Sequence, residues 1–323
     1  MKKLAFKLNI PMLRQLLISV IALITLFGST VHADNKVVVT ASFSILGDLV
    51  KVVGGDRVSV VTLVGPDEDA HVFEARPSDA KNLLKSKLFV INGLGFEPWA
   101  IKLAKSADYK GKYVIATTGV KGIKISAESE HAEDEHAEDK HAEDKHSEVD
   151  PHAWQNPENV VLYVRNIAAG LAMVDPTGAS TYLANAKAYV IQLQALNTWA
   201  KENIGAIAPD KRKVITSHDA FGYLGEQYKI KFLAPQGGST ESAPSAKGVA
   251  TIIKQIQREK IKAVFVENMS DPKLIVQLSK DVGVTVGATL YADALSGTDK
   301  PGATYLKMMR HNIMQLVAGM ALN

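Results

Sequence analysis

The sequence predicts an α/β protein of two similar lobes, with parallel sheets covered by helices and one long rigid helix bridging the lobes. Three observations support this prediction. Short β-branched runs alternate with amphipathic stretches in both halves of the chain, as in 36–42 (KVVVTAS) and 213–217 (KVITS). Such runs are typical of strands buried on both faces. Between the halves, a single apolar stripe continues through residues 177–203.

The first half contains four apolar runs that we interpret as strands, and four helical patterns that follow or separate them. The predicted strands are 36–42, 57–64, 87–92 and 112–117. The predicted helices are 44–53, 77–86, 97–106 and 157–173. With the bridging helix placed at 175–205, the first lobe spans residues 34–174 and the second lobe residues 206–323.

The predicted bridging helix has an apolar stripe whose members step by four and three residues, namely Tyr182, Ala186, Tyr189, Leu193, Leu196 and Ala200. About 27 residues at ~1.5 Å each span ~40 Å, and we interpret this length as a rigid backbone rather than a surface crossover. The second lobe then repeats the alternation. Its predicted strands are 213–217, 230–234, 261–266 and 285–291, and its predicted helices are 220–227, 245–260, 272–282 and 304–322.

The first 33 residues have the pattern of a signal peptide. Four basic residues precede an apolar run at 16–28, and the segment contains no acidic residue. We expect cleavage after about Ala33. Thirteen apolar residues are short for a membrane anchor, which needs about 20. The 323-residue chain contains no cysteine, which excludes disulfides, thiolate ligands and lipid attachment to a cysteine. We therefore expect a periplasmic protein, free of a lipid anchor and monomeric.

Removing the basic segment lowers the formal net charge from +3 to about −1. The sequence has no basic stripe of the kind that would indicate binding to nucleic acid. An acidic insert at 128–150 contains eleven carboxylates and almost no large apolar side chain, which predicts a mobile loop. Its four histidines recur every fifth residue and share no helical face, so we expect only weak, auxiliary metal binding by His131, His136, His141 and His146.

Four other polar residues lie just beyond predicted strands, where open parallel sheets bind their ligands. They are His71, His152, His218 and Asp293. Three imidazoles and one carboxylate form a complete tetrahedral set for zinc. The simpler alternative for each is a solvated loop side chain or a helix cap. Glu267 follows a predicted strand and Glu241 lies in a polar loop. Either can accept an N–H from a ligating histidine, or merely cap a helix or form a salt bridge.

The sequence resembles a known family along its length. It is similar to the metal-specific substrate-binding proteins of bacterial ABC importers for zinc and manganese, and most similar to the zinc branch. The matching stretches are GPDEDAHVFEARPSD (65–79), DPHAWQNPEN (150–159), TSHDAFGYL (216–224), STESAPSA (239–246), VFVENMSDPKL (264–274) and LYADALSG (290–297). The absence of cysteine departs from members that carry a disulfide in the second lobe.

This resemblance implies two α/β lobes bridged by one long helix, with metal bound between them by the same four residues. It also implies that a membrane permease is the partner and Zn²⁺ the transported ligand. Manganese-type members tend to replace the third histidine with a carboxylate, so His218 favours zinc. The alternatives are a manganese or iron receptor and a secreted zinc buffer or adhesin. We expect no enzyme, because the histidines are dispersed and no His-Glu-x-x-His helix is present.

Overall fold

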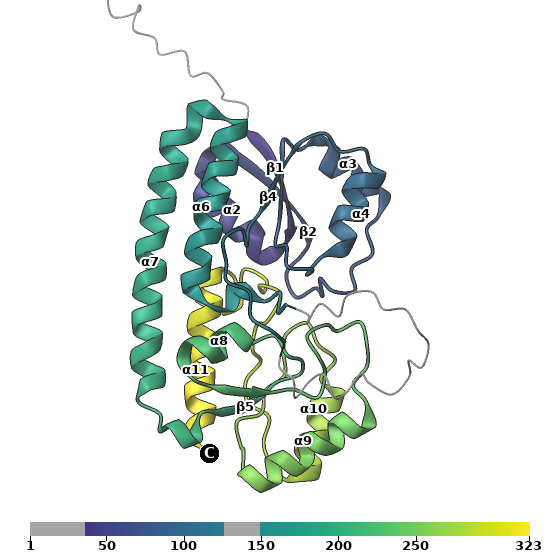
Figure 1. Ribbon diagram of the computed structural model, residues 1–323, viewed down its shortest axis with the longest axis vertical. Coiled ribbons are helices and arrows are strands. Elements are labelled where there is room, and N and C mark those ends of the chain that lie inside the picture. Colours follow the sequence, from purple (N-terminus) through teal and green to yellow (C-terminus); the bar gives the residue numbers. More distant parts are fainter. Residues whose placement is uncertain (1–35, 126–148) are drawn as a thin grey trace, which may run out of the picture. The chain divides into compact units, whose positions relative to one another are not determined.

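Two parallel sheets and a 27-residue helix organise the computed structural model, which describes residues 36–125 and 149–323 (Figure 1). The predicted signal peptide, 1–33, lies outside the described residues, as do His131, His136, His141 and His146. In the part that is described, no helix is both long enough and apolar enough to cross a membrane.

The first lobe is built on a four-stranded parallel sheet with the strand order β2-β1-β3-β4. Its strands are β1 (Val37–Phe43), β2 (Val58–Val64), β3 (Leu88–Ile91) and β4 (Lys112–Ile115). The two central strands, β1 and β3, are buried almost throughout, as their continuous apolar sequences predict. This confirms the α/β class, and each strand lies within two residues of its predicted bounds.

Helices cover both faces of this sheet (Figure 1). On one face, α3 (Pro77–Lys85) and α4 (Pro98–Ser106) share a cluster of buried side chains with β3. On the other face lie α2 (Ser44–Gly54) and α6 (Pro157–Val174). Gly170 lets α6 approach the sheet closely, because a Cβ atom there would lie only 2.1 Å from a methyl group of Val114.

The long helix α7 (Ala179–Gly205) confirms the predicted bridging element and follows a short turn at Pro176–Gly178. Its buried residues are the predicted stripe extended by one turn, namely Tyr182, Ala186, Tyr189, Leu193, Leu196, Ala200 and Ile204. It packs against α2 and α6 of the first lobe and against α8 (Gly222–Tyr228) and α11 (Tyr305–Ala321) of the second. One helix therefore supports elements from both halves of the chain. The exact lobe boundaries stay a prediction.

In the second lobe, β5 (Lys213–Ile215) pairs in parallel with β6 (Lys231–Leu233), and α9 (Ala246–Glu259) and α10 (Lys273–Val282) pack against each other. The prediction of continuous strands at 261–266 and 285–291 is wrong. These segments form single parallel bridges, such as those joining Val264 to Ile215 and to Val286.

Side chains take up backbone groups near the ends of these two segments. Asn323 accepts the backbone N–H groups of Lys262 and Ala263 through its Oδ1 atom, at 2.6 and 3.1 Å. Asn312 pairs with both backbone groups of Tyr291, at 2.9 and 2.7 Å. Backbone groups that a continuous ladder would use are thus satisfied by amides instead.

Candidate metal centre

Four buried side chains from separate loops converge on one point. Each of His71, His152, His218 and Asp293 offers one ligand atom, and these atoms all lie within 4.8 Å of one another. The histidines follow β2, β4 and β5, and Asp293 follows the bridge at Leu290. The four residues that the sequence singled out therefore lie beyond the carboxyl ends of the parallel strands in both lobes.

The distances within the group are short. Asp293 Oδ2 lies 3.0 Å from His218 Nε2 and 3.2 Å from His71 Nε2, and the Nε2 atoms of His71 and His152 are 3.4 Å apart. Yet His218 Nε2 and both carboxylate oxygens of Asp293 have no hydrogen-bond partner. Buried polar atoms almost always have one. These atoms are buried close together and are available to a shared cation.

A buried carboxylate orients the imidazole of His218. Glu267 is 1% exposed, and its Oε2 atom contacts His218 Nδ1. Its Oε1 atom accepts the backbone N–H groups of Ser217 and His218, at 2.8 and 3.2 Å. With Nδ1 paired to the carboxylate, Nε2 is left facing the centre. The structure thus places Glu267 in the position that the sequence suggested for it.

Glu241 does not take part in this arrangement. Its side chain is exposed, and its backbone N–H donates to Ser239 Oγ at 3.2 Å. The suggestion that Glu241 orients a histidine is therefore corrected. The sequence placed Glu241 only in a polar loop, which fixes neither the direction nor the reach of its side chain.

Two aspartates that the sequence reasoning missed hold the other histidines. Asp150 Oδ1 lies 2.8 Å from His152 Nδ1 and also accepts the backbone N–H of His152 at 2.9 Å. Asp69 Oδ1 accepts the backbone N–H of His71 at 2.9 Å. The signal was present as a repeated Asp-x-His spacing, in which the aspartate bonds to the backbone two residues on.

A buried polar group beneath the centre supports the loop that carries His152. Asn92 donates through Nδ2 to the carbonyl oxygen of Pro151 at 2.9 Å and accepts the hydroxyl of Tyr163 at 2.6 Å. Glu97 accepts the backbone N–H of Asn92 and the hydroxyl of Ser42. Burial raises the pKa of Glu97 to about 7, against the opposing effect of these hydrogen bonds.

The electrostatics of the centre favour a positive charge at its middle. Burial lowers the pKa of His218, but the carboxylates of Glu267 and Asp293 outweigh burial and hold it well above its usual value. Burial raises the pKa of Asp293, but His218 and His152 outweigh it and hold this pKa well below its usual value. Both shifts favour a proton on His218 beside an ionised Asp293 when no metal is bound. A divalent cation can replace that proton.

Proteins of similar sequence span almost the whole chain. The metal ABC transporter substrate-binding lipoprotein SsaB of Streptococcus sanguinis is 29% identical over 332 residues, covering 99% of this chain and 100% of that protein. The iron ABC transporter substrate-binding lipoprotein MtsA of Streptococcus pyogenes serotype M1 is 30% identical over 300 residues, covering 91% of this chain and 92% of that protein.

Solved structures show the same fold. A manganese-bound periplasmic metal binding protein from Candidatus Liberibacter asiaticus superposes with a TM-score of 0.76 at 29% identity, covering 88% of this chain and 100% of that one. The periplasmic zinc binding protein TroA from Treponema pallidum superposes with a TM-score of 0.78 at 24% identity, covering 88% of this chain and 99% of that one, and supports the fold alone.

These relatives contradict the expected localisation. The sequence led us to expect a periplasmic protein that is free of a lipid anchor, whereas SsaB and MtsA are both named as lipoproteins. That expectation is therefore withdrawn. It rested on the absence of cysteine, which excludes one chemistry of lipid attachment and does not decide between a free and a membrane-associated protein.

The family itself follows from a match over most of the chain. The family model described as zinc-uptake complex component A, periplasmic (ZnuA), matches residues 39–319. This range includes every strand exit that contributes to the centre. The chain therefore belongs to the ZnuA family of metal ABC transporter substrate-binding proteins.

Proposed function

We propose that this protein captures Zn²⁺ with His71, His152, His218 and Asp293 and delivers it to the permease of an ABC importer. The observation that carries this proposal is the convergence of four buried ligand atoms within 4.8 Å, with the oxygens of Asp293 left without a hydrogen-bond partner. A bound cation satisfies these atoms together. Membership of the family supplies the permease as partner.

The donor set favours zinc. Three neutral imidazole nitrogens and one carboxylate oxygen suit a four-coordinate borderline-soft ion, whereas Mn²⁺ prefers more oxygen ligands. The alternative is a manganese or iron receptor, in line with the iron named for MtsA. Asp293 gives this alternative a physical basis, because both of its oxygens are free to bind a metal with a larger coordination shell.

The number of protein ligands argues against a catalytic role for the centre. A hydrolytic zinc site keeps one coordination position open for a water molecule, and four protein donors close the tetrahedral shell. We therefore propose a binding role and no reaction for this centre. Because α7 runs unbroken for 27 residues, we further expect release by local movement of the ligand loops rather than by wide hinge motion of the lobes.

Metal content and competition test the proposal. After a weak chelator removes loosely held metal, the protein should retain about one equivalent of Zn²⁺, and His218→Ala should lose it. His311→Ala is the matched control, because His311 lies on α11 and bonds to the carbonyl oxygen of Thr289 at 2.8 Å. Retention of Mn²⁺ against equimolar Zn²⁺ would reject zinc in favour of manganese.

The same experiment addresses the acidic insert. We propose that His131, His136, His141 and His146 bind Zn²⁺ weakly and raise the total capacity of the protein without forming part of the tight site. Deletion of residues 128–148 should lower the number of weakly held equivalents and leave the tight one intact. Loss of the tight equivalent in this deletion would show that the insert contributes to the centre itself.

A further inference from the structure

The loop that carries His71 is fastened to the second lobe through Asp67. Asp67 Oδ1 accepts Asn268 Nδ2 at 2.8 Å, and Asp67 Oδ2 pairs with Lys300 Nζ at 2.9 Å. The backbone N–H of Asp67 donates to the carbonyl oxygen of Leu295 at 2.8 Å. Asp67 has a φ of +58°, a left-handed conformation that aspartate and asparagine tolerate better than most residues. The left-handed backbone conformation thus occurs at Asp67, the residue that makes three contacts with the other lobe.

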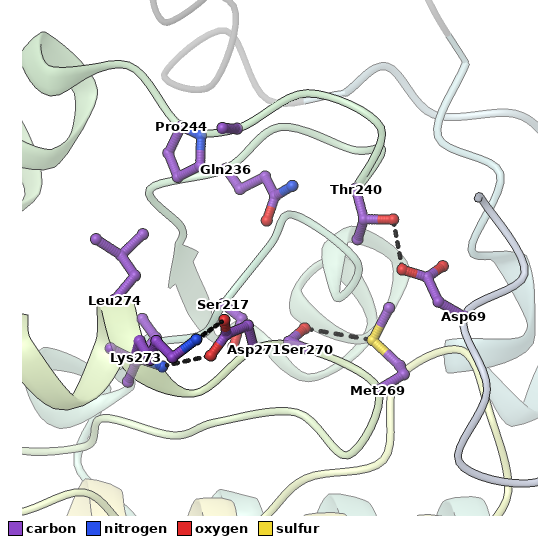
Figure 2. A pocket seen from close by; sticks show the side chains of 12 residues that line it. Asp69, Ser217, Gln236, Thr240, Pro244, Met269, Ser270, Asp271, Lys273 and Leu274 are labelled. Carbon is purple, nitrogen blue, oxygen red and sulfur yellow. Dashed lines mark hydrogen bonds and ion pairs between the residues drawn. The ribbon is translucent and has the colours of Figure 1, made fainter.

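Asp69 makes a second connection between the lobes, and this connection includes His71, one of the four proposed metal ligands. Its Oδ1 atom accepts the backbone N–H of His71 at 2.9 Å, and its Oδ2 atom accepts the hydroxyl of Thr240 at 2.7 Å. Figure 2 shows the contact between Thr240 and Asp69 across the two chain segments. One carboxylate therefore joins the backbone of a ligating histidine to a loop of the second lobe.

The partners of these two aspartates lie close to the second lobe's own ligands along the chain. Asn268 directly follows Glu267, which orients His218, and Leu295 lies two residues after Asp293. The bonds from Asp67 to Asn268 and Leu295 thus connect the segment before His71 to segments that position His218 or carry Asp293. Because the ligand set is divided between the lobes, these bonds hold its two halves together.

The Thr240 contact lies at the edge of unfilled space. A cavity of about 390 Å³ is lined by Asp69 and Thr240 together with Ser217, Gln236 and Met269 (Figure 2). Residues 237–245, which carry Thr240, form neither helix nor strand. The bond between Thr240 and Asp69 can therefore break without repacking a core, because the loop has room on one side. The contact between Thr240 and Asp69 is therefore one that can open while the cores of both lobes stay packed.

We propose that Asp67 and Asp69 form a clasp, completed by Thr240, Asn268 and Lys300, that sets the rate at which bound metal leaves the centre. This inference rests on the proposed function as a metal receptor. The clasp residues are positioning residues: they contact no metal and act by holding the His71 loop against the second lobe. Opening of the Thr240 contact frees the His71 segment first, and the metal then loses one ligand while the other three stay in place.

Release kinetics test the clasp. Zn²⁺-loaded protein is mixed with excess EDTA, and release is followed by the change in tryptophan fluorescence, to which Trp154 should contribute because its ring lies 5.3 Å from that of His152. Thr240→Val removes one hydrogen bond to a carboxylate and should raise the release rate roughly tenfold. The melting temperature of the metal-free protein should fall by no more than a few degrees. Thr240→Ser, which restores the hydroxyl, should return the release rate to that of the unmodified protein.

Thr251→Val is the matched control, because Thr251 lies in the same lobe and its hydroxyl bonds only locally, to the carbonyl oxygen of Lys247 at 3.0 Å. Asp67→Asn keeps the left-handed backbone but removes the ion pair, and should also speed release. If Thr240→Val and Asp67→Asn both release Zn²⁺ at the unmodified rate, the clasp is rejected. If the unmodified protein retains no Zn²⁺ after treatment with the weak chelator, the proposed function fails instead.

Discussion

The imidazole of His218 lies between two buried carboxylates that have different roles. Glu267 contacts Nδ1 and also accepts two backbone N–H groups, so its own position is fixed. Asp293 faces Nε2 and has no hydrogen-bond partner for either oxygen. A carboxylate whose bonds are satisfied by the protein can orient a ligand, whereas one without partners is available to a metal. Hydrogen bonding thus separates the orienting group from the proposed ligand.

This distinction predicts the effect of removing the Glu267 charge. Glu267→Gln keeps the size of the side chain but weakens its hold on the Nδ1 proton of His218, and should lower Zn²⁺ affinity about 10–100-fold. Titration against a zinc chelator of known affinity measures the change. Glu241→Gln, the same substitution at an exposed site, should leave the affinity within about twofold. Equal affinities in both variants would remove Glu267 from the metal centre.

The sequence identified the four proposed ligands because strand exits are recognisable from apolar runs, and strand exits are where parallel sheets gather polar groups. It did not identify Asp69 and Asp150, although each stands two residues before a histidine. Their contribution depends on the turn each loop makes, which brings the carboxylate back to the histidine. Such local geometry is not contained in residue type and spacing alone.

Among the elements, helices were predictable from sequence to within a few residues, and so were β5 and β6, whereas two further strands expected in the second lobe were not formed. The stripe of α7 has the period of a helix over seven turns, and no other element competes for those residues. The runs at 261–266 and 285–291 have strand composition, but they form only isolated bridges, and Asn323 and Asn312 bond to backbone groups near their ends. Those side chains come from α11 and the chain end, so the interruption is a tertiary effect.

The packing of α7 predicts how much this helix contributes to stability. Leu193 lies near the middle of the buried stripe and is 1% exposed, whereas Ile191 on the opposite side is 60% exposed. Leu193→Ala should lower the free energy of unfolding by about 2–5 kcal/mol, since it leaves a cavity between helices. Ile191→Ala should change it by about 0.5 kcal/mol or less. Urea denaturation of the metal-free protein measures both, and similar losses in both variants would contradict the buried stripe.

At the scale of the described molecule, the centre is assembled from parts that are distant in sequence. His71 and His152 belong to the first lobe and His218 and Asp293 to the second, and α7 packs against both lobes. Side-chain hydrogen bonds such as those of Asp67 and Asp69 cross between the same two halves. A metal bound by all four residues therefore acts as a further cross-link between the lobes, and its binding free energy adds to the stability of the fold.

Thermal unfolding with and without zinc measures this coupling. At free Zn²⁺ about 1,000 times the dissociation constant, linkage adds about 4 kcal/mol, which corresponds to a rise of roughly 10 °C in melting temperature. Because Glu267 and Asp293 hold the pKa of His218 well above its usual value, zinc must displace a proton there. The metal-free protein therefore keeps the stability of the protonated pair at low pH, while zinc binding weakens. The zinc-dependent rise should accordingly be smaller at pH 6 than at pH 7.5.

The control for this measurement is His218→Ala, which removes the titrating ligand. Its melting temperature should respond little to Zn²⁺ at either pH, because the three remaining side chains cannot close the coordination shell. A rise in the unmodified protein that is equal at pH 6 and pH 7.5 would show that no proton leaves on binding. In that case neither His218 nor Asp293 would carry a proton that the metal has to displace.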